Sequence, residues 1–286
     1  MDVTRSIAAT REAVAAARRA GQRIMLVPTM GALHVGHLSL MRAAGQDGGY
    51  VVVSIFVNPT QFGPSEDFAS YPRDESGDLA ACRRVGVDLV LIPPVEEMYT
   101  PDSSTTVHVA RLTETLCGAH RPGHFDGVAT VVTKLFNIVQ PDAAYFGQKD
   151  AQQLAVIRQM VRDLDMPIEI VGCPTVREAD GLAVSSRNAY LSAPQRTQAR
   201  CLSRALAEAQ ARVVDGETDP AAVIGAMRRT VEEAGPAWID YISVVDPESM
   251  QPVRTIERAV LVALAVRIGP TRLIDNVQVD PHAPGG

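Results

Sequence analysis

The sequence predicts an α/β fold: a Rossmann-like, doubly wound parallel sheet followed by a smaller C-terminal α+β domain. Three observations predict this class. Short apolar runs alternate with helical patterns as far as Gly172. Several of these runs are continuous, such as YVVVSIFV at 50–57, which is typical of strands buried on both faces of a parallel sheet. Beyond Gly172 come a polar loop, two helical segments and three alternating stretches, an order that indicates a second domain with antiparallel strands.

The first domain, taken as residues 1–175, is expected to alternate strands and helices. An Ala- and Arg-rich surface helix opens it. The expected strands of the parallel sheet lie at 23–27, 50–57, 87–92, 143–147 and 168–172. The expected helices lie at 37–44, 75–85, 125–140 and 150–165, and Asp150 stands at the N-cap of the last one.

The second domain, taken as residues 176–286, begins with the polar loop CPTVREADGLAVSSRNAYLSAP, which starts just before the boundary. Its expected helices span 193–214 and 220–234. Its expected strands, at 238–246, 258–268 and 271–279, are alternating stretches that indicate an antiparallel sheet.

Composition narrows the classes of function. The chain has 286 residues and a formal charge of −6, which argues against nucleic acid as the main partner because such surfaces carry a basic excess. A small anionic ligand, which needs only a few local donors, is compatible with this charge. No apolar run approaches the roughly 18 residues that a membrane span needs. The four cysteines lie far apart without a C-x-x-C pair, and no signal peptide is evident, so we expect reduced thiols and a cytoplasmic protein.

The stretch VPTMGALHVGHLSL, at 27–40, places two histidines between glycines just after the first long strand. Ligands of doubly wound sheets bind at such strand-to-helix turns, and a helix N-terminus favours an anion. Gly31 and Gly36 would let a phosphate approach the backbone without meeting a Cβ. His34 and His37 share one helix face, so both imidazoles can reach one phosphate chain.

Three other interpretations compete for these histidines. The spacing of Gly31 and Gly36 matches a Walker A loop, but His37 stands where that loop needs Lys and Leu38 where it needs Ser or Thr, which excludes it. A pair of metal ligands and a pair of histidines bonded to carbonyls at a helix end both stay open on the residues alone.

Five motifs then occur in order along the chain: PTMGALHVGH, FVNPTQF, RPGHFDGV, YFGQKDAQQ and PTVREADGLAVSSRNAYL. Together they resemble the pantoate–β-alanine ligase family of the H-x-G-H nucleotidyltransferase superfamily, and the similarity extends from about Leu26 to TRLIDN near Asn276. The resemblance implies a two-step reaction. The carboxylate of (R)-pantoate attacks the α-phosphate of ATP, giving pantoyl-adenylate and pyrophosphate, and the amine of β-alanine then releases AMP and forms pantothenate.

The resemblance also implies the site residues. His37 and His34 stabilise charge on the departing pyrophosphate, with His37 as the proton donor, and Lys149 reaches a phosphate while Asp150 accepts from the ribose. The ATP-binding residues are Met30, Gly31, Ala32, Leu33, His34, Val35, Gly36, His37, Gly147, Gln148, Lys149, Asp150, Val176, Val184, Ser185, Ser186 and Arg187. Gln61 and Gln153 bind the small substrates, pantoate and β-alanine, because neutral amides orient a carboxylate and a hydroxyl without quenching the nucleophile.

Further expectations follow from the same resemblance. Mg²⁺ accompanies ATP, although no residue is assigned as a metal ligand, the chain forms a homodimer, and residues 176–286 form a lid over the active site. The chain departs from the family pattern at four positions: Thr60, Gln148, Ala151 and Val184. His120, Arg121 and His124 match the family without an assigned step. Asp78 is a candidate magnesium ligand, but a lone helix carboxylate is usually solvated, so it is interpreted as solvated and left out of the site set.

Two alternative functions stay open, a second enzyme and a non-enzymatic binding protein. A nucleotidyltransferase acting on a phosphate ester would keep the histidines and the Ser-Ser-Arg loop. A nucleotide-binding sensor would bind ATP without turnover.

Overall fold

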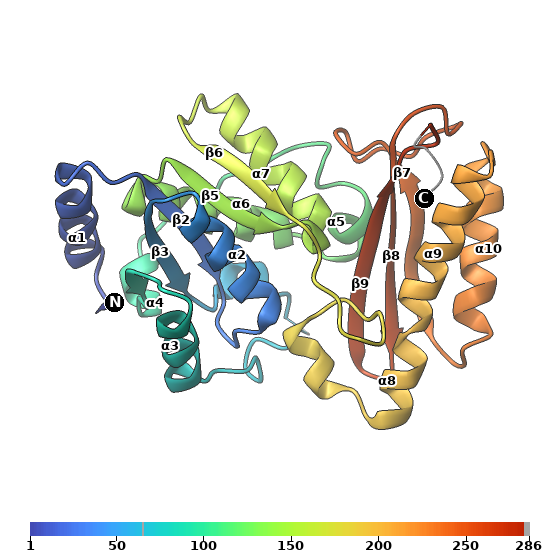
Figure 1. Cartoon of the computed structure of the whole chain (residues 1–286), viewed down its shortest axis with the longest axis horizontal. Coiled ribbons are helices and arrows are strands. Elements are labelled where there is room, and N and C mark those ends of the chain that lie inside the picture. The colour runs from blue at the N-terminus through green and yellow to red at the C-terminus, as the bar shows by residue number, and fades with distance from the viewer. Residues whose placement is uncertain (65, 283–286) are drawn as a thin grey trace. The chain divides into compact units, whose positions relative to one another are not determined.

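The computed structural model of the protein describes residues 1–64 and 66–282 (Figure 1). The chain divides into two compact units. Unit 1 comprises Met1–Ala110, Arg121–Gln148 and Val156–Pro174, and unit 2 comprises Arg111–His120, Lys149–Ala155 and Thr175–Gly286. Two short segments that the sequence analysis assigns to the first domain therefore cluster with unit 2.

Unit 1 is built on a six-stranded sheet in the order β1-β4-β3-β2-β5-β6. The strands are β1 Asp2–Thr4, β2 Ile24–Thr29, β3 Tyr50–Ile55, β4 Leu89–Leu91, β5 Ala143–Gly147 and β6 Glu169–Cys173. Every pair is parallel, which confirms the predicted doubly wound sheet. The chain passes outward from β2 through β3 to β4 and returns to the other side of β2 as β5. The carboxyl ends of β2 and β5 therefore flank the switch point at which such sheets bind ligands.

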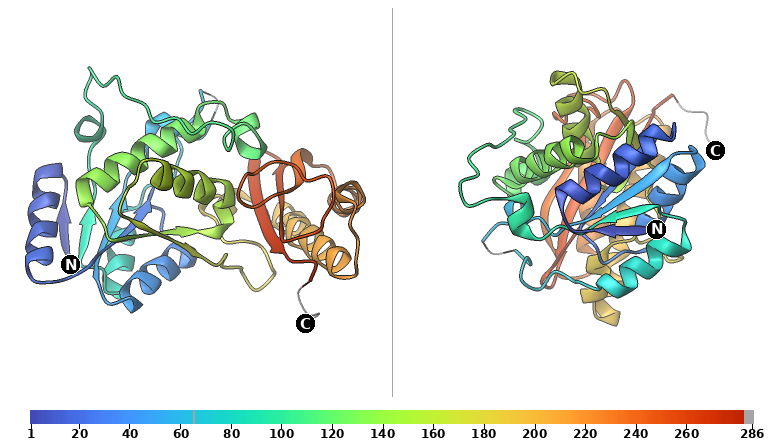
Figure 2. Two further views of the ribbon diagram at one scale, coloured as in Figure 1. Left: turned by 90° about the horizontal axis from the view of Figure 1, so that it is seen from above. Right: turned by 90° about the vertical axis from the view of Figure 1, so that its left-hand side faces the viewer.

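Helices cover both faces of this sheet. They are α1 Ile7–Arg19, α2 Val35–Gln46, α3 Glu75–Arg84, α4 Val95–Met98, α6 His124–Val139 and α7 Ala151–Asp163, of which α7 begins in unit 2 and continues in unit 1. Met25, Val27 and Val53 pack with Met41 of α2 and Cys82 of α3 in one core beneath one face. Figure 2 shows α6 and α7 on the opposite face, and Thr133 Oγ1 of α6 donates to Met160 Sδ of α7 at 3.1 Å.

The order of the predicted strands and helices of unit 1 agrees with the structure, which adds the unpredicted one-turn helix α4 and shows two informative differences at the amino-terminal stretch and at α2. The amino-terminal stretch is not helical throughout, because Asp2–Thr4 form β1 at the edge of the sheet beside β4. Helix α2 begins at Val35 rather than near residue 37, because His34 is already its N-cap. Three residues are too few to show a strand period, and histidine is an unusual N-cap, so neither feature carries a clear local signal.

Unit 2 is an antiparallel sheet in the order β7-β8-β9, formed by β7 Trp238–Val245, β8 Val260–Ile268 and β9 Thr271–Val279. Its helices are α5 Leu116–His120, α8 Ala193–Ala199, α9 Cys201–Val214 and α10 Pro220–Glu232, so the expected single helix over 193–214 is two helices that meet at Arg200. Leu206 of α9, Met227 of α10 and Leu264 of β8 share one buried core. The α+β class of this domain is confirmed.

Within the described residues, no helix combines the length and the apolar character that a membrane crossing requires.

Candidate active site

The loop that joins β2 to α2 contains the first predicted nucleotide-binding residues. It follows Thr29, the last residue of β2, whose hydroxyl donates to Ser54 O at 2.7 Å and accepts from Gly31 N at 3.2 Å. Gly31 and Ala32 both have positive φ, +78° and +50°. This backbone conformation turns the chain sharply from the strand into the helix, and glycine adopts it at little cost.

The carboxylate of Asp78, on α3, holds this loop. Its Oδ2 accepts from Ala32 N at 2.9 Å and its Oδ1 accepts from Leu33 N at 2.7 Å. Asp78 is only 4% exposed, and burial raises its pKa against the opposing effect of the two N–H donors. A Cβ on Gly31 would lie 2.8 Å from Asp78 Oδ2. The absence of a side chain at Gly31 therefore leaves room for the carboxylate. Asp78 is therefore a buried side chain of α3 that supports the loop, and its interpretation as a solvated side chain is wrong.

His34 and His37 lie together at the start of α2. Their ring centroids are 3.9 Å apart with an interplanar angle of 23°, and His34 N donates to His37 Nδ1 at 3.3 Å. A Cβ on Gly36 would lie 3.1 Å from two atoms of the His34 ring. The second glycine of the motif thus makes room for an imidazole, where the sequence analysis expects room for a phosphate. The two rings stand half-buried at a helix N-terminus, which favours negative charge.

Gln61 ends a 3₁₀ turn, Pro59–Gln61, beyond β3 and is buried. Its Oε1 accepts from Asn58 Nδ2 at 3.1 Å, and its Nε2 contacts Met30 Sδ at 3.2 Å. The structure therefore brings this predicted pantoate ligand next to the nucleotide loop. Asn58 Nδ2 also donates to Gly127 O at 3.1 Å, and a Cβ on Gly127 would lie 2.4 Å from Thr60 O, so α6 approaches this turn closely.

Arg121 and His124, which the sequence analysis leaves without a role, hold the backbone of Gln61. Gln61 O lies 2.8 Å from His124 Nδ1 and accepts from Arg121 Nη2 at 3.3 Å. Arg121 also binds both carboxylate oxygens of Glu66, at 2.6 and 2.7 Å. Burial alone would raise the pKa of Glu66, but the hydrogen bonds and charge of Arg121 lower this pKa to about 2. A bidentate pair of this kind fixes the direction of the guanidinium.

The predicted residues after β5 are divided between the two units. Gly147 is the last residue of β5 and Gln148 follows it in unit 1, whereas Lys149 and Asp150 belong to unit 2. Gln148–Asp150 form a 3₁₀ turn that continues directly into α7. Asp150 is therefore the last residue of this turn, where the sequence predicts a separate N-cap residue. Lys149 O accepts from Asn276 Nδ2 at 2.8 Å.

Gln153 lies half-buried on the first turn of α7, in unit 2. The adjacent Gln152 is buried, and its amide accepts from Cys117 N at 2.9 Å and donates to Leu112 O and Thr115 O, both at 2.8 Å. Gln152 therefore fixes the start of α7 against the Arg111–His120 segment, and Gln153 is the next residue of that fixed turn.

The loop from Thr175 to Tyr190 is folded back on itself in unit 2. Arg177 and Ala183 form an antiparallel bridge, and Val184 N donates to Val176 O at 3.0 Å. Two of the predicted ATP-binding residues, Val176 and Val184, are therefore paired with each other through their backbones. Ser185 caps the 3₁₀ turn Ser186–Tyr190 by accepting from Arg187 N at 3.3 Å, so the Ser-Ser-Arg sequence is ordered by its own backbone.

Comparison with known proteins places the chain among ligases. The sequence matches the model of the pantoate-beta-alanine ligase family over residues 2–278. Pantothenate synthetase of Herpetosiphon aurantiacus is 57% identical over 272 residues, covering 95% of this chain and 99% of that protein. Pantothenate synthetase of Moorella thermoacetica is 57% identical over 284 residues, covering 98% of this chain and 99% of that protein. The chain belongs to the pantoate–β-alanine ligase family.

Solved structures of family members have the same fold. The crystal structure of pantothenate synthetase from Thermus thermophilus superposes with a TM-score of 0.92 at 46% identity, covering 97% of this chain and 99% of that chain. The pantoate-beta-alanine ligase of Francisella tularensis, solved as a complex with beta-gamma ATP and beta-alanine, superposes with a TM-score of 0.80 at 32% identity, covering 97% of each chain.

The predicted family residues thus fall into two ordered groups. In unit 1, the structure brings Gln61 to Met30 and stacks the two histidines. In unit 2, it pairs Val176 with Val184. Sequence reasoning missed the residues that support these groups, because a carboxylate such as Asp78 has no local pattern that separates it from a solvated side chain.

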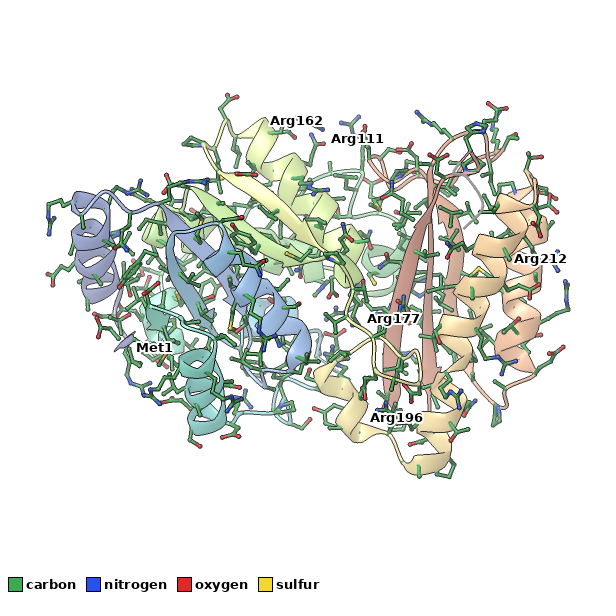
Figure 3. The ribbon with its side chains drawn as sticks, viewed as in Figure 1. Met1, Arg111, Arg162, Arg177, Arg196 and Arg212 are labelled. Carbon is green, nitrogen blue, oxygen red and sulfur yellow. The ribbon has the colours of Figure 1, made fainter. Side chains whose placement is uncertain are left out.

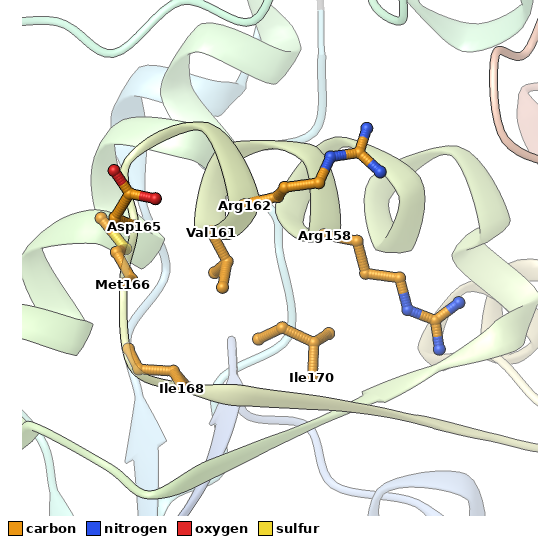
Figure 4. A pocket seen from close by; sticks show the side chains of 7 residues that line it. All are labelled: Arg158, Val161, Arg162, Asp165, Met166, Ile168 and Ile170. Carbon is orange, nitrogen blue, oxygen red and sulfur yellow. The ribbon is translucent and has the colours of Figure 1, made fainter.

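A surface hollow of about 490 Å³ lies in unit 1 (Figure 4). Apolar side chains of α7 and of the approach to β6 meet there, with two arginines and one carboxylate at the rim. Its lining is Arg158, Val161, Arg162, Asp165, Met166, Ile168 and Ile170. None of the predicted site residues lines it, so this hollow is not part of the candidate active site.

Proposed function

We propose that the protein catalyses the ATP-dependent condensation of (R)-pantoate with β-alanine to pantothenate, AMP and pyrophosphate, through a pantoyl-adenylate. One observation supports this most directly. The stacked His34 and His37 stand at the N-terminus of α2, at the switch point of the sheet, in a chain that matches the ligase family over nearly its whole length. The Francisella tularensis relative, which was solved with a nucleotide and β-alanine, has the same fold.

In the first step, a carboxylate oxygen of pantoate forms a bond to the α-phosphorus of ATP, and the bond from that phosphorus to the bridging oxygen breaks. Negative charge then accumulates on the departing pyrophosphate. His37 and His34, together with the N–H groups at the start of α2, stabilise this charge, and His37 supplies a proton. Lys149 binds a phosphate oxygen as a point charge. Ser185, Ser186 and Arg187 supply hydroxyl and guanidinium donors that suit phosphate oxygens.

The two glutamines orient the acid substrate. Gln61 and Gln153 have neutral amides, which hold a carboxylate and a hydroxyl without the strong ion pair that would reduce the nucleophilicity of the carboxylate. The Asn58 and Arg121 contacts support Gln61 on its side chain and on its backbone. In the second step, the amine of β-alanine attacks the activated carbonyl carbon, loses a proton and expels AMP.

We infer that Mg²⁺ enters with ATP and is held by phosphate oxygens and water. The described residues contain no group of three or more His, Cys, Asp or Glu side chains that could hold a metal. Magnesium in phosphate-transfer sites commonly keeps several waters and relies on the substrate's phosphates, so the residues present fit an ion that arrives with the nucleotide. When bound, the ion neutralises phosphate charge.

Three further assignments stand as proposals: a homodimer, a cytoplasmic location, and a lid role for residues 176–286. The four cysteines are free and buried, which supports a reducing compartment. Light scattering tests the homodimer, which predicts a particle of twice the mass of one chain. Small-angle scattering with and without ATP tests the lid, which predicts a smaller radius of gyration with nucleotide bound.

Exchange of labelled pyrophosphate into ATP, measured without β-alanine, tests the proposed reaction. We expect exchange only when pantoate is present, because the adenylate must form and reverse. Free AMP should then appear at turnover levels only after β-alanine is added. ATP binding without exchange would indicate a nucleotide-binding protein and would overturn the proposal. Exchange that requires a phosphate ester in place of pantoate would indicate a different nucleotidyltransferase.

A further inference from the structure

Two adjacent residues of β9, Asp275 and Asn276, each contact a different nucleotide-binding segment of unit 2. Successive side chains of a strand point to opposite faces of the sheet. Asp275 shares its face with Leu273, which packs in the helix-covered core, and Asn276 lies on the other face. Neither residue belongs to the site set that the sequence predicts.

Asp275 holds the loop that carries Val176. Its carboxylate, only 1% exposed, binds Arg177 through two bonds, Nη1 to Oδ2 at 2.6 Å and Nη2 to Oδ1 at 3.0 Å. Figure 3 labels Arg177 beside β9. Arg177 Nη1 also donates to Gly181 O at 3.1 Å, across the turn of the same loop. A bidentate pair defines both the position and the plane of the guanidinium, so the backbone next to Val176 is fixed to β9.

Asn276 holds the segment that carries Lys149. Its Nδ2 donates to Lys149 O at 2.8 Å. That oxygen belongs to the planar peptide unit between Lys149 and Asp150, so one hydrogen bond orients the whole unit. Asn276 N in turn donates to Asp275 Oδ1 at 2.8 Å. The carboxylate that binds Arg177 therefore also bonds to the residue that binds Lys149 O.

We propose that Asp275 and Asn276 are positioning residues for adenylate formation, with Asp275 setting the nucleotide loop and Asn276 setting Lys149. The inference rests on the proposed function, because that function has Lys149 bind a phosphate oxygen and Val176 is one of the ATP-binding residues that the family resemblance implies. The proposal assigns a different effect to each residue. Loss of the Asn276 contact weakens the interaction with pyrophosphate, and loss of the Asp275 contact weakens the interaction with ATP.

The test uses the full-length protein and the pantoate-dependent exchange reaction. Asn276→Asp keeps the shape of the side chain but removes the N–H donor to Lys149 O when ionised. It should raise the KM for pyrophosphate by about 3- to 10-fold, the range expected for one lost hydrogen bond. Asp275→Asn keeps the size of the side chain and removes its charge, and should raise the KM for ATP by at least about 5-fold, since bonds to charged groups are stronger.

Gln278→Ala is the matched control. Gln278 lies on the same strand, two residues beyond Asn276 and exposed, so its removal should leave both constants within about 2-fold of the parent. A lower fraction of folded protein would reduce the maximal rate without changing either KM, so the two constants separate positioning from loss of structure. Should Asp275→Asn fail to fold, Asn276→Asp and Arg177→Gln provide the same pair of measurements.

The outcomes are distinct. Selective increases, of pyrophosphate KM in Asn276→Asp and of ATP KM in Asp275→Asn, support the inference. Unchanged KM values in both variants overturn it, whether or not the maximal rate falls. Absence of pantoate-dependent exchange in the parent protein would instead overturn the proposed function.

Discussion

Replacing Arg121 by Gln should raise the pKa of Glu66 and destabilise unit 1 in a pH-dependent way. In the parent protein this guanidinium lowers the pKa of Glu66 from 4.5 to about 2, through bonds of 2.6 and 2.7 Å. The side chains of Arg121 and Glu66 are only 15% and 24% exposed, so water screens the pair weakly. Without Arg121, burial acts on Glu66 with less opposition, and the pKa of Glu66 should rise toward its ordinary value.

The magnitude follows from proton linkage. A carboxylate with a lowered pKa stabilises the folded protein above its unfolded pKa of 4.5, and this contribution is lost as the pH falls toward 2. The shift corresponds to about 3 kcal/mol at pH 7 and about 1.4 kcal/mol at pH 3. The difference in unfolding free energy between parent and Arg121→Gln should therefore be largest near neutral pH and should shrink below pH 4.5.

Two measurements check this reasoning. The carboxyl ¹³C shift of Glu66 against pH gives its pKa in each protein, and urea unfolding at several pH values gives the stability difference. Arg5→Gln is the control, because Arg5 and Glu75 pair at 2.6 Å but are 58% and 47% exposed, and such pairs contribute about 1 kcal/mol or less. A Glu66 that titrates near 4.5 in the parent, or at the same pH in both proteins, would refute the argument. The KM for pantoate should also rise in Arg121→Gln, since Gln61 O loses a donor.

Three further predictions concern the same site. His37→Ala should lower pantoate-dependent exchange by about 10²- to 10³-fold while ATP still binds in calorimetry. His108 is an exposed histidine paired with Asp126, so the control His108→Ala should leave the exchange rate unchanged. An unchanged rate in His37→Ala would remove His37 from the mechanism. Asp78→Asn should raise the KM for ATP by about 10-fold, because two loop N–H groups lose a charged acceptor, and a KM equal to that of the parent would contradict this role. Gly127→Ala should destabilise the protein by about 1–3 kcal/mol in thermal unfolding, because its Cβ would lie 2.4 Å from Thr60 O, whereas Gly45→Ala, with open space around it, should be neutral or stabilising.

The sequence by itself determined the order of the longer strands and helices and the identity of the motif residues, but not β1, α4, α5 or the break between α8 and α9. Continuous apolar runs marked β3 and β5 closely, and the polar alternation of 271–279 matched β9. These features are local, because strand and helix periods depend on burial along one segment. The family motifs are local as well, since each one is read from a few consecutive residues.

Only the tertiary structure decided which side chains support the motifs. Asp78 reaches a loop 46 residues earlier, and Asn276 reaches Lys149 across 127 residues. The stacking of His34 on His37 and the room that Gly36 provides for it also depend on the folded geometry. The physical reason is that periodicity records whether a residue is buried but not which partner it meets. A hydrogen bond between distant residues is fixed only once packing has brought its donor and acceptor within about 3 Å.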